Sequence, residues 1–370
     1  MFRLLWEQAS VQPEYSYGPS RPKLCPGRCL KSLRERPMQK YEQEMIQWGK
    51  LLFERRLISG WGGNISCRMG ENDFLVTGQH APLGFLTPED LVRINNAGQP
   101  VNKSQRASSE TLMHMAVYTG TETQVIIHVH PPLVLAFSLT HDRFVPVSFE
   151  EKYTIGEVPI IAQDTPTVTE PEKVVEELRY HPVVIIKGHG TVAIGKSFQE
   201  AFLLTDLLEE AVRCRFFTEP MGNADVSPTD LQSAQAAGVA PSTGERYAMF
   251  SKEHMTALVD SANRDSDFRS RGEETGLSTS LTLSLDESEA AWTVHFANGE
   301  ITHLSQGDSG EFMISGQQEW WSAVFRARID PFLATQQGKL KLKRGELSHL
   351  SRWYRPFQRA FSIWQTIPIQ

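Results

Sequence analysis

Short apolar runs alternate with amphipathic segments over residues 38–217. The runs are rich in β-branched residues and have the length of strands, and they lie at 74–76, 125–130, 183–186 and 191–194. The helical segments between them lie at 109–118, 171–180 and 197–217. The last segment opens with Ser197 and Glu200, which have the spacing of a capping box. This alternation predicts an α/β domain over residues 38–217.

The pattern changes beyond residue 217. Residues 218–245 are dominated by Gly, Pro, Ser, Thr and Ala without periodicity, which predicts a linker. Residues 281–285 and 292–296 then alternate apolar and polar positions, and Asn298-Gly299 is a hairpin signal. A final helix carries a stripe of large apolar residues, Leu350, Tyr354, Phe357, Phe361 and Trp364. The order of elements predicts a smaller α+β domain over residues 246–370.

The first 37 residues differ from the rest of the chain. They are rich in Pro, Arg and Lys and show no sustained period, whereas a clean amphipathic helix opens at Met38. We interpret residues 1–37 as a disordered or spurious leader, with translation starting at Met38. A basic transit peptide is the alternative.

Composition narrows the class of protein. Of the 370 residues 40% are hydrophobic and 22% are charged, as in an ordinary soluble globular protein. The formal net charge of -7 disfavours a nucleic-acid partner. No apolar run approaches the roughly 20 residues that cross a bilayer. The four cysteines are sparse and irregularly spaced, which suits a reducing compartment, so we expect a cytoplasmic protein.

The pair His128 and His130 ends the run 125–130, directly before Pro131-Pro132. Side chains two residues apart on a strand leave the same face, about 6.5–7 Å apart at the backbone. Two imidazoles at that separation can converge on one metal ion at about 2.0–2.1 Å per bond. The pair alone is equally consistent with two polar strand residues, so a metal site needs further ligands.

Two more residues supply what the pair lacks. His189 lies between Gly188 and Gly190, where the backbone can turn tightly and a ligand can approach closely. Glu110 stands at the start of the helix before the histidine strand. Three neutral histidines with one open position are typical of catalytic zinc sites, and a nearby carboxylate can act as acid and base. Taken alone, Glu110 also fits an acidic residue that complements a helix N-terminus.

These residues belong to six motifs whose order resembles the class II aldolase/adducin family. The motifs are Gly62-Gly63-Asn64-Ile65-Ser66, Phe74-Leu75-Val76-Thr77, Leu86-Thr87-Pro88-Glu89-Asp90-Leu91, Ser108-Ser109-Glu110, His128-Val129-His130-Pro131-Pro132 and Gly188-His189-Gly190. The resemblance implies a three-layer α/β/α fold over about 38–217 and a homotetramer with active sites at subunit interfaces. It also implies a divalent metal, zinc with manganese as the alternative, on the residues matching His128, His130 and His189. Glu110 matches the family's acid/base carboxylate.

The same resemblance implies a pocket for a substrate anion. The matching residues are Asn64, Ser66, Ser108 and Ser109, whose hydroxyls and backbone N–H groups would take up the anion. For the two adjacent serines, helix capping and turn stabilisation are an equal alternative. The segment from Thr77 to His80 departs from the family, because His80 stands where phosphate-binding members have a glycine. This departure argues against a phosphorylated substrate, and His80 would instead bond a carboxylate or hydroxyl, or cover the pocket.

A second departure concerns the proton donor. Glu150 stands near the position of the tyrosine that protonates the leaving carbanion in some sugar-phosphate aldolases, and Tyr153 follows three residues later. Both are candidates, and solvated loop residues are the alternative. A carboxylate at this position also occurs in family members that catalyse decarboxylation.

The second domain resembles the sterol carrier protein type two domain over about 247–364. The motifs are Trp292-Thr293-Val294-His295-Phe296-Ala297-Asn298-Gly299, Glu311-Phe312-Met313-Ile314-Ser315, Asp330-Pro331-Phe332-Leu333-Ala334 and Gly338-Lys339-Leu340-Lys341-Leu342. This resemblance implies helices on a five-stranded sheet, often around an apolar tunnel for acyl chains or sterols. The aromatic stripe of the last helix would line that tunnel or simply pack on the sheet.

The leading hypothesis is therefore a metal-dependent aldolase, a carbon–carbon lyase that acts on a small hydroxy-carbonyl compound through a metal-stabilised enediolate. A decarboxylase of a keto or hydroxy acid on the same metal is the first alternative. A non-catalytic, adducin-like scaffold with a lipid-binding domain is the second. The expected partners are a small carbonyl or carboxylate substrate and a lipid or acyl ligand in the C-terminal domain.

Overall fold

The computed structural model describes residues 32–165, 167–219 and 246–370. Most of the predicted leader and linker lie outside these residues. Helix α1 (Ser32–Glu54) begins at Ser32 rather than at Met38. By its contacts the chain divides after Lys40 into two units, and the architecture below concerns residues 41–370.

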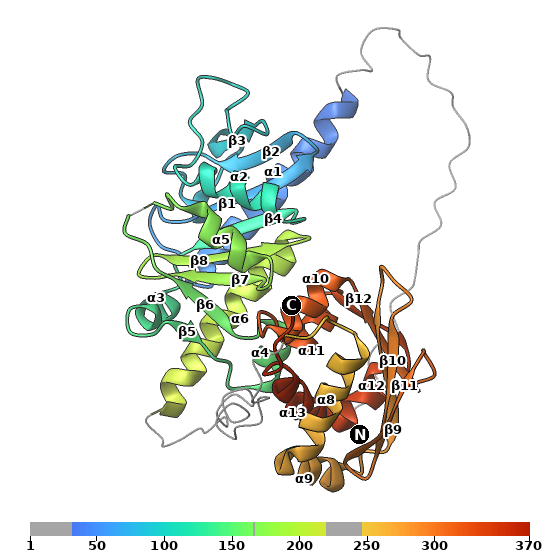
Figure 1. Ribbon diagram of the computed structural model, residues 1–370. Helices are drawn as coiled ribbons and strands as arrows, with labels where there is room; N and C mark the ends of the chain where they lie inside the picture. Colours follow the sequence, from blue (N-terminus) through green and yellow to red (C-terminus); the bar gives the residue numbers. More distant parts are fainter. Residues whose placement is uncertain (1–31, 166, 220–245) are drawn as a thin grey trace, which may run out of the picture. The chain divides into compact units, whose positions relative to one another are not determined.

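The first domain is built on a mixed sheet of eight strands in the order β3-β2-β1-β4-β8-β7-β6-β5 (Figure 1). The strands are β1 (Asn64–Gly70), β2 (Asp73–Thr77), β3 (Leu91–Ile94), β4 (Val125–Val129), β5 (Arg143–Phe144), β6 (Val158–Ile161), β7 (Val183–Ile186) and β8 (Gly190–Gly195). In the described residues, β6 and β7 are the one parallel pair of neighbours in this sheet. The predicted strands therefore exist, and they pair mainly antiparallel.

Helices cover both faces of this sheet. They are α2 (Thr111–Gly120), α3 (Pro132–Ser138), α4 (Phe149–Thr154), α5 (Pro171–Leu178) and α6 (Phe198–Thr218), together with α1. One apolar core packs α1, α3 and α6 on the sheet, and a second packs α2 and α5 on the opposite face. Neighbouring strand residues alternate between the two, since Ile127 belongs to the first core and Ile126 to the second. The described residues thus form the three layers that were predicted.

Side-chain caps fix where two of these helices start. Ser197 Oγ accepts a hydrogen bond from Glu200 N, as the predicted capping box requires, but the Glu200 carboxylate accepts from Lys196 N. Helix α4 has a complete capping box between Ser148 and Glu151. The carboxylate of Glu151 is therefore occupied in holding the helix start.

The second domain has a five-stranded sheet in the order β11-β10-β9-β12-β13. Its strands are β9 (Thr279–Leu285), β10 (Ala291–Ala297), β11 (Glu300–Gln306), β12 (Phe312–Gly316) and β13 (Leu340–Arg344). Its helices are α8 (Lys252–Arg264), α9 (Ser266–Thr275), α10 (Gln318–Phe325), α11 (Pro331–Gln336), α12 (Leu347–Leu350) and α13 (Tyr354–Trp364). Asn298 and Gly299 join β10 to β11 with φ of 49° and 83°, so the predicted hairpin is confirmed.

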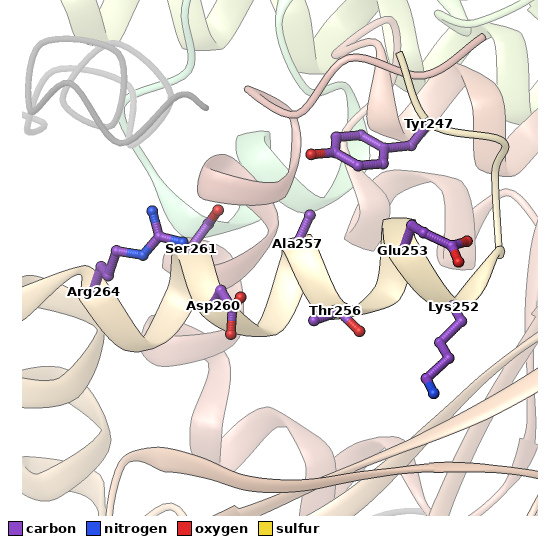
Figure 2. Close-up of a pocket in the computed structure, with 8 residues that line it drawn as sticks. All are labelled: Tyr247, Lys252, Glu253, Thr256, Ala257, Asp260, Ser261 and Arg264. Atoms are coloured by element: carbon purple, nitrogen blue, oxygen red, sulfur yellow. The ribbon is translucent and has the colours of Figure 1, made fainter. Parts of the chain in front are cut away.

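The aromatic stripe of α13 belongs to the core of this domain. Phe357, Phe361 and Trp364 are buried in one apolar cluster, and Trp364 Nε1 donates to Leu258 O at 3.0 Å. This placement matches the alternative in which the stripe packs on the sheet. A hollow of about 410 Å³ lies along α8 (Figure 2), and its lining differs from an apolar tunnel. Four charged side chains border it, those of Lys252, Glu253, Asp260 and Arg264.

A buried ion pair ties α13 to α9, and its removal gives a stability prediction. Arg359 is 2% exposed, and its Nε donates to Asp265 Oδ1 at 3.0 Å. Asp265 also caps α9 by accepting from Phe268 N. Arg359→Ala leaves a buried carboxylate without its cation, so we expect the free energy of unfolding to fall by about 3–5 kcal/mol.

Denaturant titration of the full chain measures this loss. The matched control is Arg355→Ala on the same helix, because Arg355 is exposed and pairs with an exposed Glu274. The control is expected to change the free energy by at most about 1 kcal/mol. Equal losses in the two variants would show that the buried ion pair contributes no more to the free energy of unfolding than the exposed pair.

Candidate metal centre

The sheet topology brings the three predicted histidine ligands to the adjoining ends of two central strands, β4 and β8. Strand β4 ends at Val129, just before His130, and β8 begins at Gly190, just after His189. Because β4 and β8 pair antiparallel with Val129 opposite Thr191, the end of one strand lies beside the start of the other. His128 lies one position further inside β4.

The three imidazoles converge there. Ring centroids are 4.7 Å apart for His128 and His189 and 5.0 Å apart for the two other pairs. One nitrogen from each ring lies within 4.8 Å of the other two. The Nε2 atoms of His128 and His130 are only 3.2 Å apart. The predicted ligand set is thus a real cluster of side chains.

The bonding of His128 indicates which atom is free to bind a metal. Its Nδ1 lies 2.9 Å from Thr191 O, a carbonyl that can only accept, so Nδ1 carries the proton. In a neutral ring Nε2 is then unprotonated, and its lone pair points at His130. A proton on His130 Nε2 or a cation between the two rings would satisfy this lone pair at 3.2 Å. Together with the nearby nitrogen of His189, the donor set fits a divalent metal.

The electrostatics keep the cluster neutral. Burial lowers the pKa of all three rings, and for His130 burial together with His189 brings the pKa to about 4. Neutral imidazole is the form that coordinates metal ions, so the ligands need not lose a proton near neutral pH.

Glycines make room for the His130 ring. A Cβ atom on Gly62 would lie 2.8 Å from His130 Nδ1, and one on Gly190 would lie 2.5 Å from His130 Cδ2. Gly188 has φ of +68°, which L side chains rarely adopt. Gly62 and Gly190 thus leave space for the His130 ring, and Gly188 allows the turn that precedes His189.

A cavity of about 570 Å³ opens beside the histidines. Its lining includes His130, His189, Gln163 and Lys187. Gln163 Nε2 lies 3.0 Å from His189 Nδ1, and Lys187 Nζ is held by Asp142 at 2.7 Å. The cavity therefore combines the candidate metal ligands with a cation and an amide.

Glu110 lies outside the residues that line this cavity. Its carboxylate oxygens accept from Val168 N at 3.2 and 3.4 Å, and Gln163, five residues before Val168, contacts His189. Glu110 is 5% exposed, and burial raises the pKa of its carboxyl, partly offset by the bond from Val168. Glu110 is also the N-cap residue of α2, where a carboxylate complements the helix N-terminus even without a cap bond, so that alternative stays open.

Comparison with known proteins assigns the domain that holds this cluster. Residues 43–216 match the family model described as Class II Aldolase and Adducin N-terminal domain. The crystal structure of L-fuculose-1-phosphate aldolase from Thermus thermophilus is 31% identical, with a TM-score of 0.46, and the match covers 50% of this chain and 98% of that one. The chain belongs to this family through its first domain.

Two curated proteins are similar to the class II aldolase/adducin domain. An L-fuculose phosphate aldolase of Methanococcus maripaludis is 29% identical over 174 residues, which cover 47% of this chain and 94% of that protein. A 3-oxo-tetronate 4-phosphate decarboxylase of Haemophilus influenzae is 29% identical over 185 residues, which cover 47% of this chain and 85% of that protein.

The second domain is similar to a crystal structure of sterol carrier protein 2, which matches 32% of this chain and 98% of that chain at 19% identity, with a TM-score of 0.30. The described α+β fold agrees with the sequence analysis, and the sterol-carrier relationship stays a prediction.

In the class II aldolase/adducin domain, three predicted substrate residues are occupied by bonds within the protein. Thr77 Oγ1 accepts from Ile65 N at 3.2 Å, and Ser108 Oγ accepts from Glu110 N at 3.2 Å. Ser66 is fully buried, bonds to His114 and Tyr118, and does not line the cavity. These side chains hold the site together in this structure, and their contact with substrate stays a prediction.

The other predicted substrate residues are placed differently. Asn64 is buried and pairs with His128 across β1 and β4, whereas Ser109 and His80 are exposed. His80 has φ of +62°, in the left-handed region that favours glycine. The backbone at this position would therefore suit a glycine, although the side chain is a histidine.

The proton-donor candidates do not lie in this cavity. Both are on α4, where Glu150 is exposed and Tyr153 is half-buried, and burial raises the pKa of Tyr153. Neither residue lines the cavity beside the histidines. Their role in catalysis stays a prediction.

The site also contains residues that the sequence analysis missed. His114 and Tyr118 follow Glu110 at intervals of four, so a helical reading of the same motif places all three on one face. Gln163 and Lys187 had no comparable signal. They reach the cavity because separate loops meet there.

Proposed function

We propose that the class II aldolase/adducin domain holds one divalent metal on His128, His130 and His189, with zinc expected first and manganese second. The family and its curated relatives make the chain a metal-dependent lyase of the aldolase type. The observation that carries the metal proposal is the pair of Nε2 atoms 3.2 Å apart, with His128 Nδ1 already engaged by Thr191. A metal bound there supplies positive charge for the oxygens on which negative charge develops.

Glu110 is the proposed acid and base of this site. Its buried carboxyl has a raised pKa, so it holds a proton more readily than an exposed glutamate. It would take the hydroxyl proton of the substrate during cleavage and return it during condensation. Val168 N holds its carboxylate, and Gln163, five residues earlier in the chain, contacts His189.

The proposed substrate is a small hydroxy-carbonyl compound with an anionic group. Lys187 lines the cavity and supplies a cation, which Asp142 also contacts, and Asp164 adds a carboxylate to the same lining. The sequence at His80 argued against phosphate, yet both curated relatives are named for phosphorylated compounds, and the backbone at His80 lies in the left-handed region that favours glycine. Phosphate and carboxylate therefore both stay in the proposal.

Aldol cleavage and decarboxylation are separated by their products. The similarity to a protein named as a decarboxylase favours keeping decarboxylation as the second candidate. The metal-loaded chain is incubated with panels of phosphorylated and carboxylated hydroxy-carbonyl compounds, and released aldehyde and CO₂ are measured. Aldehyde supports the proposal, and CO₂ without aldehyde replaces it by the alternative. Purified protein that takes up no stoichiometric metal would leave only the scaffold interpretation.

We also propose that this domain assembles with copies of itself, as the family resemblance implies. Several apolar side chains on it are widely exposed, among them Trp61 at 74%, Phe85 at 68%, Leu112 at 62% and Leu139 at 60%. Contact with other copies would remove this apolar surface from water. Sedimentation of the full chain tests the expected tetramer, and a monomer at micromolar concentration would contradict it. Among the described residues, no helix is long and apolar enough to cross a membrane.

A further inference from the structure

A line of four buried polar side chains runs from α2 to the start of β1. Tyr118 Oη lies 2.8 Å from Ser66 Oγ, and Ser66 Oγ lies 2.6 Å from His114 Nδ1. His114 Nε2 lies 2.5 Å from Asn64 Oδ1. All four side chains are at most 5% exposed. The proposed reaction gives no role to His114 or Tyr118.

His114 must use its two ring nitrogens differently. Burial lowers its pKa to about 3, so the ring is neutral at physiological pH. A neutral imidazole has one N–H donor and one acceptor nitrogen. The hydrogen bonds along the line therefore run in one of two directions.

Only one direction satisfies every hydroxyl in the line. If Tyr118 donates to Ser66, Ser66 can donate to His114 Nδ1, and His114 Nε2–H donates to Asn64 Oδ1. In the reverse direction Ser66 donates to Tyr118, whose buried O–H then has no acceptor among the described residues. An unmade bond of this kind costs about 1–3 kcal/mol. The phenol at the end of the line thus sets the tautomer of His114.

The favoured direction decides what Asn64 offers to a ligand. Its Oδ1 is engaged by His114, whereas its Nδ2 has no hydrogen-bond partner among the described residues. Asn64 lies directly opposite His128 in the pairing of β1 with β4. We infer that His114 is a positioning residue that turns the Asn64 amide so that its N–H₂ group, and not its oxygen, faces an anionic substrate.

This inference rests on the proposed function only for the identity of the ligand. It predicts a tautomer that can be measured without turnover. The full chain is labelled with ¹⁵N-histidine, and the ring-nitrogen resonances are recorded at neutral pH. The His114 resonances are assigned as the pair of ring-nitrogen signals, typical of a neutral imidazole, whose chemical shifts change in Ser66→Ala. We expect the Nε2–H tautomer, and an Nδ1–H tautomer would overturn the inference.

Two variants test the consequence for binding. Ser66→Ala removes the donor to His114 Nδ1, so the amide of Asn64 loses its fixed orientation. Tyr118→Phe keeps that donor but removes the phenol that sets the direction of the line, so it should weaken binding in the same sense. With 2-phosphoglycolate as the probe in calorimetry, we expect the dissociation constant to rise about tenfold or more in Ser66→Ala and by a smaller factor in Tyr118→Phe. Metal content should stay equal in both.

The outcomes separate the inference from the proposed function. Equal affinity in Ser66→Ala and the wild type would overturn the positioning role of His114 while leaving the metal and the product assays untouched. A wild type that does not bind 2-phosphoglycolate would overturn the donor role of Asn64 together with the anionic substrate. The wild-type tautomer measurement remains decisive even if a variant folds poorly.

Discussion

His130→Ala is expected to purify without stoichiometric metal and to lose turnover by about 10³-fold or more, because a metal supplies several kcal/mol of transition-state stabilisation in sites of this kind. The His130 ring provides one of the two nitrogens that face each other at 3.2 Å. The variant keeps two of the three ligands, and neither can take the coordination position that His130 leaves empty. Metal per chain by mass spectrometry and turnover on the substrate found by screening measure the two effects together.

A histidine outside the site provides the control for this experiment. His349 is exposed and pairs only weakly with an exposed Glu346 at 4.0 Å. His349→Ala should retain metal and turnover. A His130→Ala protein that turns over at the wild-type rate without metal would remove the metal from the mechanism. Loss of turnover with full metal content would give His130 another role than ligation.

The parts of the site that were predictable from sequence are local. The two-residue spacing of His128 and His130 fixes a common face of a strand. Glycines on either side of His189 mark a turn, and the structure gives Gly188 a positive φ. In each case neighbouring residues in the chain determine the geometry, so a pattern reveals it.

The parts that were not predictable depend on pairings between distant segments. Glu110 owes its position to Val168, and His114 is bonded to Asn64, with more than forty residues between the partners in each case. The antiparallel pairing of β4 with β8 likewise follows from packing of the whole sheet and not from either strand alone.

Some residues predicted to bind substrate turn out to have partners inside the protein. Small hydroxyl side chains near a turn serve equally well as ligands and as caps, so residue type does not decide between these roles. Ser66 is the clearest example, since its hydroxyl bonds two buried side chains. The same ambiguity affects α13, where aromatic spacing fits both a tunnel lining and a core, and the structure places Phe357 and Trp364 in the core.

Glu110→Gln is expected to lower kcat by about 10²–10⁴-fold while leaving the metal in place. The metal should stay because the ligand cluster consists of the three histidines alone. Glutamine keeps the shape of the side chain and can still accept from Val168 N, but it cannot exchange a proton. The matched control is Glu209→Gln, because Glu209 is also buried, bonded by backbone N–H groups and raised in pKa by burial.

The pH profile distinguishes a proton-transfer role of Glu110 from a structural one. Burial raises the pKa of this carboxyl, so its basic form is lost at a higher pH than in an exposed glutamate as the solution is acidified. The acid limb of kcat/KM should therefore lie above the usual glutamate range in the wild type and disappear in Glu110→Gln. Above that pKa the folded wild type carries a buried charge that the unfolded chain solvates better, so the variant should be at least as stable at pH 8. An unchanged acid limb in Glu110→Gln, or equal losses of turnover in Glu209→Gln, would assign the proton transfer to another group.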